Sequence, residues 1–226
     1  MKVAAVLPAS AALVPRRAAG HVTAMDRMTL NLPRIRRALE APAGGSSDYD
    51  LNPDAPRPAR RPLRPASVLV PLVERGSGVN LILTRRAALL RHHPGQVAFP
   101  GGKQEPGDPT PLAAALREAE EEIALPPAQV EVLGTLDPHE TVTSFAVQPF
   151  VGVVDPGFRP RPDPAEVEEV FEVPLAFVLD PANLQVHGRV WQGVLRRYYV
   201  IPYGPHYIWG ATARMLKALS DRVLPS

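Results

Sequence analysis

The strongest chemical signal in this sequence is an acidic hexapeptide, REAEEE, at residues 117–122. If the hexapeptide is helical, Glu118, Glu121 and Glu122 are spaced i, i+3 and i+4 and share one face. Like charges on neighbouring turns repel each other, so this face costs the helix stability unless a cation is present. Carboxylate and water oxygens are the ligands that Mg²⁺ and Mn²⁺ prefer. The spacing therefore predicts a divalent-cation site, and its alternative is an ordinary solvated acidic face.

These acids need a helix to align them, and the surrounding residues predict one over residues 111–125. Pro111 suits the first turn of a helix, and the Pro pair that follows the segment ends it. Arg117 lies one turn before Glu121, so this pair offsets part of the repulsion and orients a carboxylate. One narrow apolar stripe is predicted to be the buried face, formed by Leu112, Leu116, Ala119 and Ile123.

A glycine turn, FPGG at residues 99–102, lies directly upstream of the helix. Two consecutive glycines permit backbone conformations and close approaches that other residues do not. The backbone carbonyl of Gly102 can therefore join the carboxylates around a metal ion. The turn and the acidic helix together favour the cation site over the solvated face.

Strands are predicted on both sides of this helix. Apolar, β-rich runs over residues 66–73 and 79–86 flank the turn signal ERGSG, which predicts a hairpin. Further strands are expected over 130–137 and 146–154, a mostly helical segment over 164–180, a strand pair over 190–203 with a turn at Gly193, and a closing helix over 211–223. This order predicts an α/β (α+β) sandwich around a mixed central sheet.

The segment from Gly102 to Leu125 resembles the Nudix box, the signature of hydrolases of nucleoside diphosphates linked to another moiety. Its Arg-Glu and Glu-Glu positions are filled here by Arg117, Glu118, Glu121 and Glu122. This sequence departs from the family pattern in three ways: Asp108 replaces the first Glu, the segment from there to Arg117 is one residue longer, and Ala124 replaces the late Gly. The resemblance implies a Nudix-like α/β/α sandwich.

A second motif, ILTRRAALLRHHPGQVAFPGG at residues 82–102, resembles the extra signature of the coenzyme A pyrophosphatase branch of that family. The closing segment YIWGATARML at residues 207–216 is also similar to that branch, and the resemblance covers roughly residues 30–222. It implies that water attacks the pyrophosphate of coenzyme A, giving 3′,5′-ADP and 4′-phosphopantetheine. The expected cofactor is Mg²⁺ or Mn²⁺, because bound divalent ions neutralise the dense negative charge of the transition state.

The resemblance also implies roles for single residues. Glu118 and Glu122 are expected as metal ligands, with the carbonyl of Gly102, while Glu121 is a ligand or a catalytic helper and Arg117 orients the acidic cluster. Nudix enzymes often bring a further acid from outside the box as ligand or general base. The first choice for it is Glu166, followed by Glu168, Glu169 and, as the runner-up, Glu140.

Three arginines of the second motif, Arg85, Arg86 and Arg91, are expected to hold substrate phosphates, because guanidinium groups bind phosphate bidentately. Their alternative role is surface charge at the end of a strand. Trp209 is expected either to stack on adenine or to belong to the core. Two loop histidines, His92 and His93, are either proton relays or ordinary surface residues.

The body of the chain is preceded by a basic N-terminal region. Residues 1–65 carry 11 Lys and Arg against 5 Asp and Glu. We expect a flexible extension over residues 1–30, a short helix followed by a Pro-rich basic linker over residues 31–65, and the Nudix domain over residues 66–226. The first 20 residues weakly resemble a signal peptide, but two prolines interrupt their apolar stretch.

Several classes of protein are disfavoured by composition. The chain has no cysteine, and no apolar run approaches the roughly 20 residues that span a bilayer, so a cytoplasmic enzyme without membrane contact is expected. The run RPARRPLRP at residues 57–65 attracts phosphate, but it has no interleaved aromatic residues, which favours a linker over a nucleic-acid site. A homodimer is left open.

Three functions remain compatible with the sequence. The first is a coenzyme A pyrophosphatase. The second is a Nudix hydrolase of another nucleotide, such as ADP-ribose or a dinucleotide, because the box alone does not select the substrate. The third is a non-catalytic Nudix-fold binding module, which the intact acidic triad disfavours.

Overall fold

The computed structural model describes residues 30–41, 44–55, 57, 62–90, 92–191 and 193–224, so Arg91 and almost all of the predicted extension over 1–30 lie outside it. Its centre is a nine-stranded sheet with the main order β1-β7-β8-β2-β3-β4, joined by β5 beside β2, β6 beside β8 and β9 beside β3. These strands are β1 Ser46–Ser47, β2 Arg64–Arg75, β3 Gly78–Arg86, β4 Val97–Ala98, β5 Gly101–Lys103, β6 Val130–Thr135, β7 His139–Glu140, β8 Phe145–Val154 and β9 Val167–Pro174.

The sheet is mixed, as the sequence predicts. Strand β2 pairs in parallel with β8 along ten residues, from Arg64 beside Phe145 to Val73 beside Val154. It also pairs antiparallel with β3, which confirms the predicted hairpin. Both strands are buried along most of their length because helices cover both faces of the sheet.

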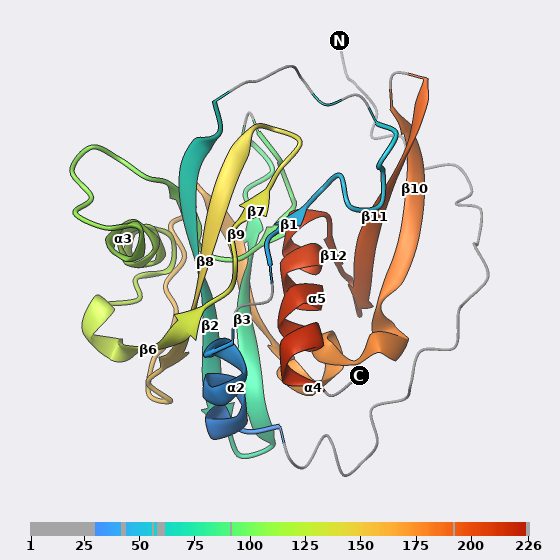
Figure 1. The fold of residues 1–226 in the computed structure, drawn as a ribbon. Helices are drawn as coiled ribbons and strands as arrows, with labels where there is room; N and C mark the ends of the chain where they lie inside the picture. Colours follow the sequence, from blue (N-terminus) through green and yellow to red (C-terminus); the bar gives the residue numbers. More distant parts are fainter. Residues whose placement is uncertain are drawn as a thin grey trace.

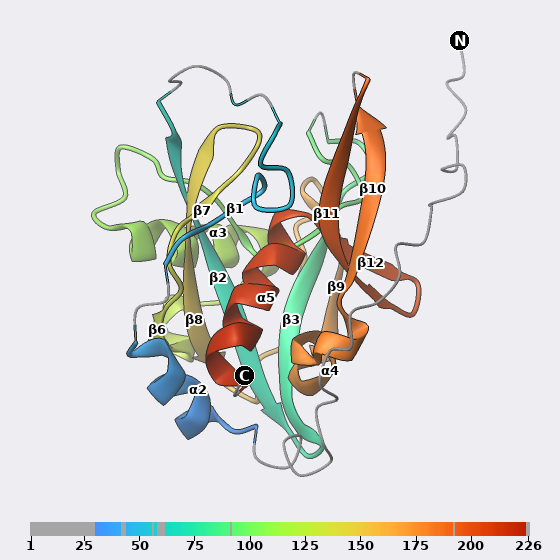
Figure 2. The same ribbon diagram turned by 45° about the vertical axis from the view of Figure 1, so that its right-hand side comes forward.

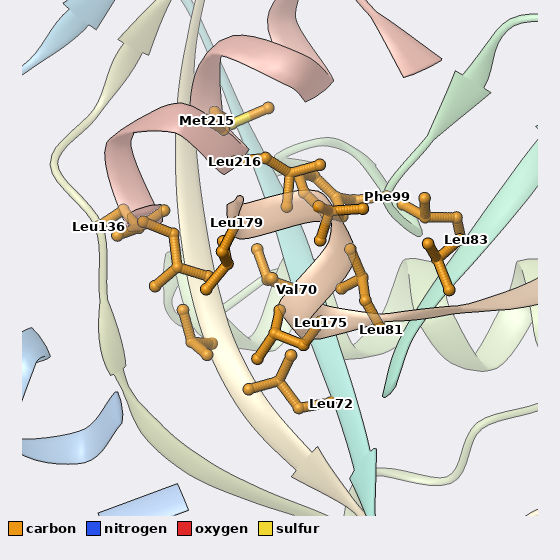
Figure 3. Close-up of a cluster of buried hydrophobic side chains, with 14 of the residues drawn as sticks. Val70, Leu72, Leu81, Leu83, Phe99, Leu136, Leu175, Leu179, Met215 and Leu216 are labelled. Carbon is orange, nitrogen blue, oxygen red and sulfur yellow. The ribbon is translucent and has the colours of Figure 1, made fainter. Parts of the chain in front are cut away.

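Helix α3 (Pro111–Ile123) covers one face of the sheet, and α4 (Leu175–Leu179) and α5 (Ala211–Val223) cover the other (Figure 1). Side chains alternate between these two cores along β3. Ile82 packs in the cluster on the α3 side, whereas Leu81 and Leu83 pack in the cluster on the α4 and α5 side. In Figure 3, Leu175, Leu179, Met215 and Leu216 meet the sheet from that second side. This arrangement confirms the predicted α/β/α sandwich.

A small antiparallel sheet lies beside α5 (Figure 2). It consists of β10 (Gln185–Trp191), β11 (Val194–Tyr203) and β12 (His206–Trp209). Ile201 and Ile208 are fully buried and join the core on the α5 side. The predicted strand pair with its turn at Gly193, which has φ 77°, is therefore confirmed. In the part of the chain that is described, no helix is long and apolar enough to cross a membrane.

The prediction of a mostly helical segment over residues 164–180 is wrong. Strand β9 occupies most of it and only α4 is helical. The register between β9 and β3 shifts at Arg85 and Arg86, so that β9 carries one extra residue, Glu168. Val170 packs against the core on the α3 side and Phe171 against the other core, and the bulge interrupts the alternation of the strand, which left an apolar spacing that resembles a helix.

Part of the predicted linker is ordered instead. The expected short helix is present as α2 (Leu32–Leu39), with Asn31 as N-cap and with Ile35 and Leu39 buried. After it, β1 pairs in parallel with β7, and both Tyr49 and Asn52 are buried. Polar contacts rather than apolar periodicity hold this segment, so composition alone did not predict its packing.

Candidate functional site

Helix α3 is defined by a cap at each end. At its start the Thr110 side chain accepts a hydrogen bond from the backbone N–H of Ala113, at 3.1 Å, and Pro111 occupies the first turn. At its end Ala124 takes the left-handed conformation, with φ 56°, and its N–H binds the carbonyls of Ala119 and Glu120. The predicted helix is confirmed. The caps fix where it begins and ends, and so which residues lie on its acidic face.

The buried face of α3 differs slightly from the predicted stripe. Ala119 and Ile123 are fully buried as expected, but Leu112 and Leu116 are only partly buried. Ala114 and Ala115 are fully buried instead, and their small side chains let the helix approach β2 and β5. This rotation brings Glu122 inward, where its side chain is only 3% exposed.

Glu122 is the buried acid at the centre of the site. The N–H of Gly101 donates to its carboxylate at 3.3 Å, and Arg86 Nη1 lies 3.7 Å from Glu122 Oε1. Burial raises the pKa of Glu122 to about 8, and the charges of Glu118 and Glu166 add to the rise, while Arg86 and the Gly101 bond oppose it. Burial therefore disfavours the charged form of Glu122.

Glu118 lies next to the glycine turn, with 16% of its side chain exposed. A Cβ atom at Gly102 would lie 2.4 Å from Glu118 Oε1, so only glycine permits this packing. Burial raises the pKa of Glu118, Arg117 lowers it, and the charges of Glu121 and Glu166 raise it further. The turn therefore lies against both carboxylates, with Gly101 bound to Glu122 and Gly102 packed beside Glu118.

Arg117 connects the loop to the helix. Its guanidinium donates to both carboxylate oxygens of Asp108, at 3.0 and 3.2 Å, and to the carbonyl of Lys103 at 3.2 Å. It also donates to Glu118 at 3.2 Å and to Glu121 at 2.8 Å, which confirms the predicted i, i+4 pair. Arg117 holds the pKa of Asp108 below its usual value. No sequence pattern assigned Asp108 a role, although it fills the family's first acidic position.

Glu121 does not join the other two acids. Its side chain is 60% exposed and is turned toward Arg117. Within the described ranges, no group of three or more acidic or histidine side chains is arranged to hold a metal ion. On α3 the three acids therefore differ in exposure, from buried Glu122 through Glu118 to exposed Glu121, and their expected roles at a metal ion stay predictions. Glu120 is exposed, as predicted.

The acids outside the helix divide between the two faces of the sheet. The charge of Glu166 acts on both Glu118 and Glu122, although burial has the larger effect on their pKa values. Glu168 and Glu169 instead pair with Arg85, at 3.4 and 3.0 Å, because the bulge in β9 places two residues opposite one. The runner-up, Glu140, lies in β7, next to the edge strand β1 at the other end of the main sheet order.

The predicted substrate arginines also separate. Consecutive strand residues point to opposite faces, so Arg86 faces α3 and Arg85 faces the other core. Arg85 and Arg86 therefore lie on different faces of the sheet, and their roles in holding substrate phosphates stay predictions. Arg91 is outside the described residues. His92 and His93 are exposed, and partly buried Trp209 packs edge-on against Tyr198, with ring centroids 5.3 Å apart.

The residues around Glu118 and Glu122 fit a divalent cation. Mg²⁺ is usually bound by one or two carboxylates together with waters and substrate phosphates, so a cage of three acids is not required. Glu118 and Glu122 supply two partly desolvated carboxylates. The glycine turn lies against them, and Glu166 is a further acid nearby. The buried negative charge would also be compensated by the ion.

Comparison with known proteins gives consistent matches. A family model described as NUDIX domain matches residues 63–191. A protein of Klebsiella pneumoniae (strain 342), described as "Uncharacterized Nudix hydrolase NudL", is 45% identical over 173 residues, which cover 74% of this chain and 88% of that protein. A protein of Salmonella newport (strain SL254) with the same description is 44% identical over 160 residues, covering 71% and 83%. The crystal structure of the Nudix hydrolase RenU from M. smegmatis has 23% identity and a TM-score of 0.43, covering 50% and 72%.

Proposed function

The chain belongs to the Nudix hydrolase family, and from that premise we propose that it hydrolyses the pyrophosphate bond of coenzyme A or a derivative, releasing 3′,5′-ADP and 4′-phosphopantetheine. The observation that carries this proposal is the meeting of two motifs at one place. Arg86, from the segment that resembles the coenzyme A branch, lies 3.7 Å from Glu122 of the Nudix box. The segment that selects the substrate therefore borders the acids that act on it.

Each acid has a separate role in the proposed reaction. Glu118 and Glu122, with the carbonyl of Gly102, would hold Mg²⁺ or Mn²⁺, which when bound neutralises the diphosphate and polarises water. Glu121 stays outside this pair and acts through Arg117, which orients Glu118. Glu166 is exposed and within electrostatic reach of both ligands, so it is the first candidate for accepting a proton from the attacking water.

On the substrate side, Arg86 is placed to bind a phosphate of the diphosphate, since its guanidinium points toward the acidic pair. Arg85 faces the small sheet, where Glu168 and Glu169 bind it, so its part in the reaction is to position β9. Trp209 remains the candidate for stacking on adenine, because its ring is only partly buried.

A panel of substrates tests the proposal. The protein is incubated with coenzyme A, ADP-ribose, NADH and nucleoside triphosphates, each with Mg²⁺ or Mn²⁺, and the products are separated by chromatography. We expect coenzyme A to be cleaved with the highest kcat/KM and to yield 3′,5′-ADP. Cleavage of ADP-ribose or a dinucleotide without cleavage of coenzyme A would show a different Nudix substrate, and no cleavage of any compound would support a binding module.

A further inference from the structure

We propose that Arg86 is the counter-ion of Glu122 in the metal-free protein, and that a divalent cation displaces it toward the substrate phosphates. This inference rests on the proposed function, because it assigns Glu122 to the metal site. It adds a competition between a residue of the chain and the metal ion. Binding of metal and binding of substrate are coupled as a consequence.

The first observation is that the guanidinium of Arg86 makes no hydrogen bond to any described residue. Arg117 binds four neighbouring groups, and Arg85 donates to Glu169 at 3.0 Å. By contrast, among the described residues no acceptor is hydrogen-bonded to the guanidinium of Arg86, whose side chain is 26% exposed. Its pairing with Glu122, at 3.7 Å, is longer than a hydrogen bond. Arg86 therefore approaches Glu122 as a charge, with its donors free for another ligand.

The second observation is the burial of Glu122. A charged carboxylate that is only 3% exposed needs a compensating charge, because removing it from water is costly. Among the described residues, the polar partners of this carboxylate are the cation of Arg86, 3.7 Å away, and the N–H of Gly101, 3.3 Å away. A loose pair between an unbonded guanidinium and a buried carboxylate supplies this compensation and is easily exchanged.

The backbone of Arg86 is fixed, so its side chain can lie beside Glu122 without metal and reach the substrate phosphates when metal is bound. Arg86 is the last residue of β3, where its N–H binds the carbonyl of Gln96, and the N–H of Gly95 binds its carbonyl, each at 3.0 Å. The side chain therefore starts from a fixed point at the edge of the site, and its long flexible stem can swing without moving the strand. Divalent ions and Arg86 repel each other, so Arg86 weakens metal binding until a phosphate accepts it.

Equilibrium binding of Mn²⁺ tests this competition without relying on activity. Titrations of the wild type, Arg86→Met and Arg85→Met at pH 8.5, followed by electron paramagnetic resonance, give the Kd of each. We expect Arg86→Met to bind Mn²⁺ about tenfold more tightly than the wild type, since the competing cation is gone. Arg85→Met, which removes the same charge from the other face of the sheet, is expected to leave the Kd within about twofold.

Each outcome separates the two proposals. A wild type that binds no Mn²⁺ contradicts the proposed function. A wild type that binds Mn²⁺ with an Arg86→Met variant of equal or weaker affinity contradicts only the role of Arg86.

Discussion

At the scale of single residues, the site depends on how a buried carboxylate is kept available for a cation. Glu122 is almost fully buried, and the described residues give it one backbone hydrogen bond and one loose cation. Glu118, by contrast, is partly exposed and bound by Arg117. The two acids therefore differ in environment although they lie one turn apart. Buried Glu122 has the larger effect on how stability depends on pH.

The raised pKa of Glu122 predicts how stability depends on pH. Burial raises this pKa from 4.5 to about 8, so between these values the folded chain retains a proton that the unfolded chain releases. Without metal, the contribution of Glu122 to the free energy of unfolding is therefore fully present below pH 4.5 and falls as pH rises to 8, by a few kcal/mol.

Urea unfolding of the wild type and of Glu122→Gln with a chelator, from pH 5 to 8.5, measures this contribution as a difference between the two. We expect the wild type to lose stability relative to the variant across that range. A difference that stays constant with pH would show that Glu122 keeps an ordinary pKa.

An added methyl group should have different effects at the two glycines of the turn. It should reduce activity at Gly102 and stability at Gly101. At Gly102 a Cβ meets only the movable end of Glu118, so Gly102→Ala should fold normally but lose about 10–100-fold in kcat as the carboxylate is displaced. At Gly101, where φ is 150°, a Cβ would lie 2.4 Å from the backbone oxygen of Ser67, so Gly101→Ala should lose about 1–3 kcal/mol of stability.

Assays of activity and of Tm on both glycine variants separate these effects. The account predicts a Tm close to wild type for Gly102→Ala and a clearly lower one for Gly101→Ala. Full activity in Gly102→Ala would mean that the position of Glu118 does not matter for the reaction.

At the scale of elements, α3 carries a strained end where the family has glycine. Ala124 adopts φ 56°, a conformation that costs a residue with a Cβ about 1–2 kcal/mol. Ala124→Gly should therefore raise the free energy of unfolding by about 0.5–1 kcal/mol, after the entropy lost by glycine is subtracted. Ala113→Gly is the matched control, since the same change inside the helix should lower stability by about 1 kcal/mol.

Urea unfolding of both variants measures whether each change raises or lowers the free energy of unfolding. Destabilisation by Ala124→Gly would show that the end of the helix is not strained in solution.

Elements with one strong pattern were predictable from the sequence, and elements shaped by their neighbours were not. The helix over α3, the β2–β3 hairpin and α5 follow from apolar spacing and turn residues, which act locally. Strand β9 did not follow, because its bulge depends on its pairing with β3. The contact of Arg86 with Glu122 was equally unpredictable, since it needs the strand order that places β3 beside β2, the strand against which α3 packs.

At the scale of the whole molecule, a strap formed by residues 46–52 ties three separate elements together. Ser46 and Asp48 bind the two ring nitrogens of buried His139 in β7, at 2.8 and 3.1 Å. Asp50 pairs with Arg214 of α5 at 2.7 Å. The strap therefore links the central sheet to the closing helix, and the sequence concealed it because its contacts are polar and specific rather than periodic.

The last residue of the strap predicts a loss of stability on substitution. The Asn52 side chain accepts from the N–H of Arg197 at 2.7 Å and donates to the carbonyl of Arg197 at 2.8 Å, which joins the strap to β11. Asn52→Ala would leave two backbone groups without these partners and should cost about 2 kcal/mol. Exposed Asp54→Ala is the control and should change stability by less than about 0.5 kcal/mol. Equal stability of both variants in urea would contradict a structural role for the strap.

The claim on which the account depends is that Glu118 and Glu122 hold a divalent cation. Crystals soaked in Mn²⁺ and measured at a wavelength where manganese scatters anomalously would test it most directly. The account predicts an anomalous peak within coordination distance of both carboxylates in the wild type, and none in Glu122→Gln. A wild-type map without manganese beside these two acids would contradict it.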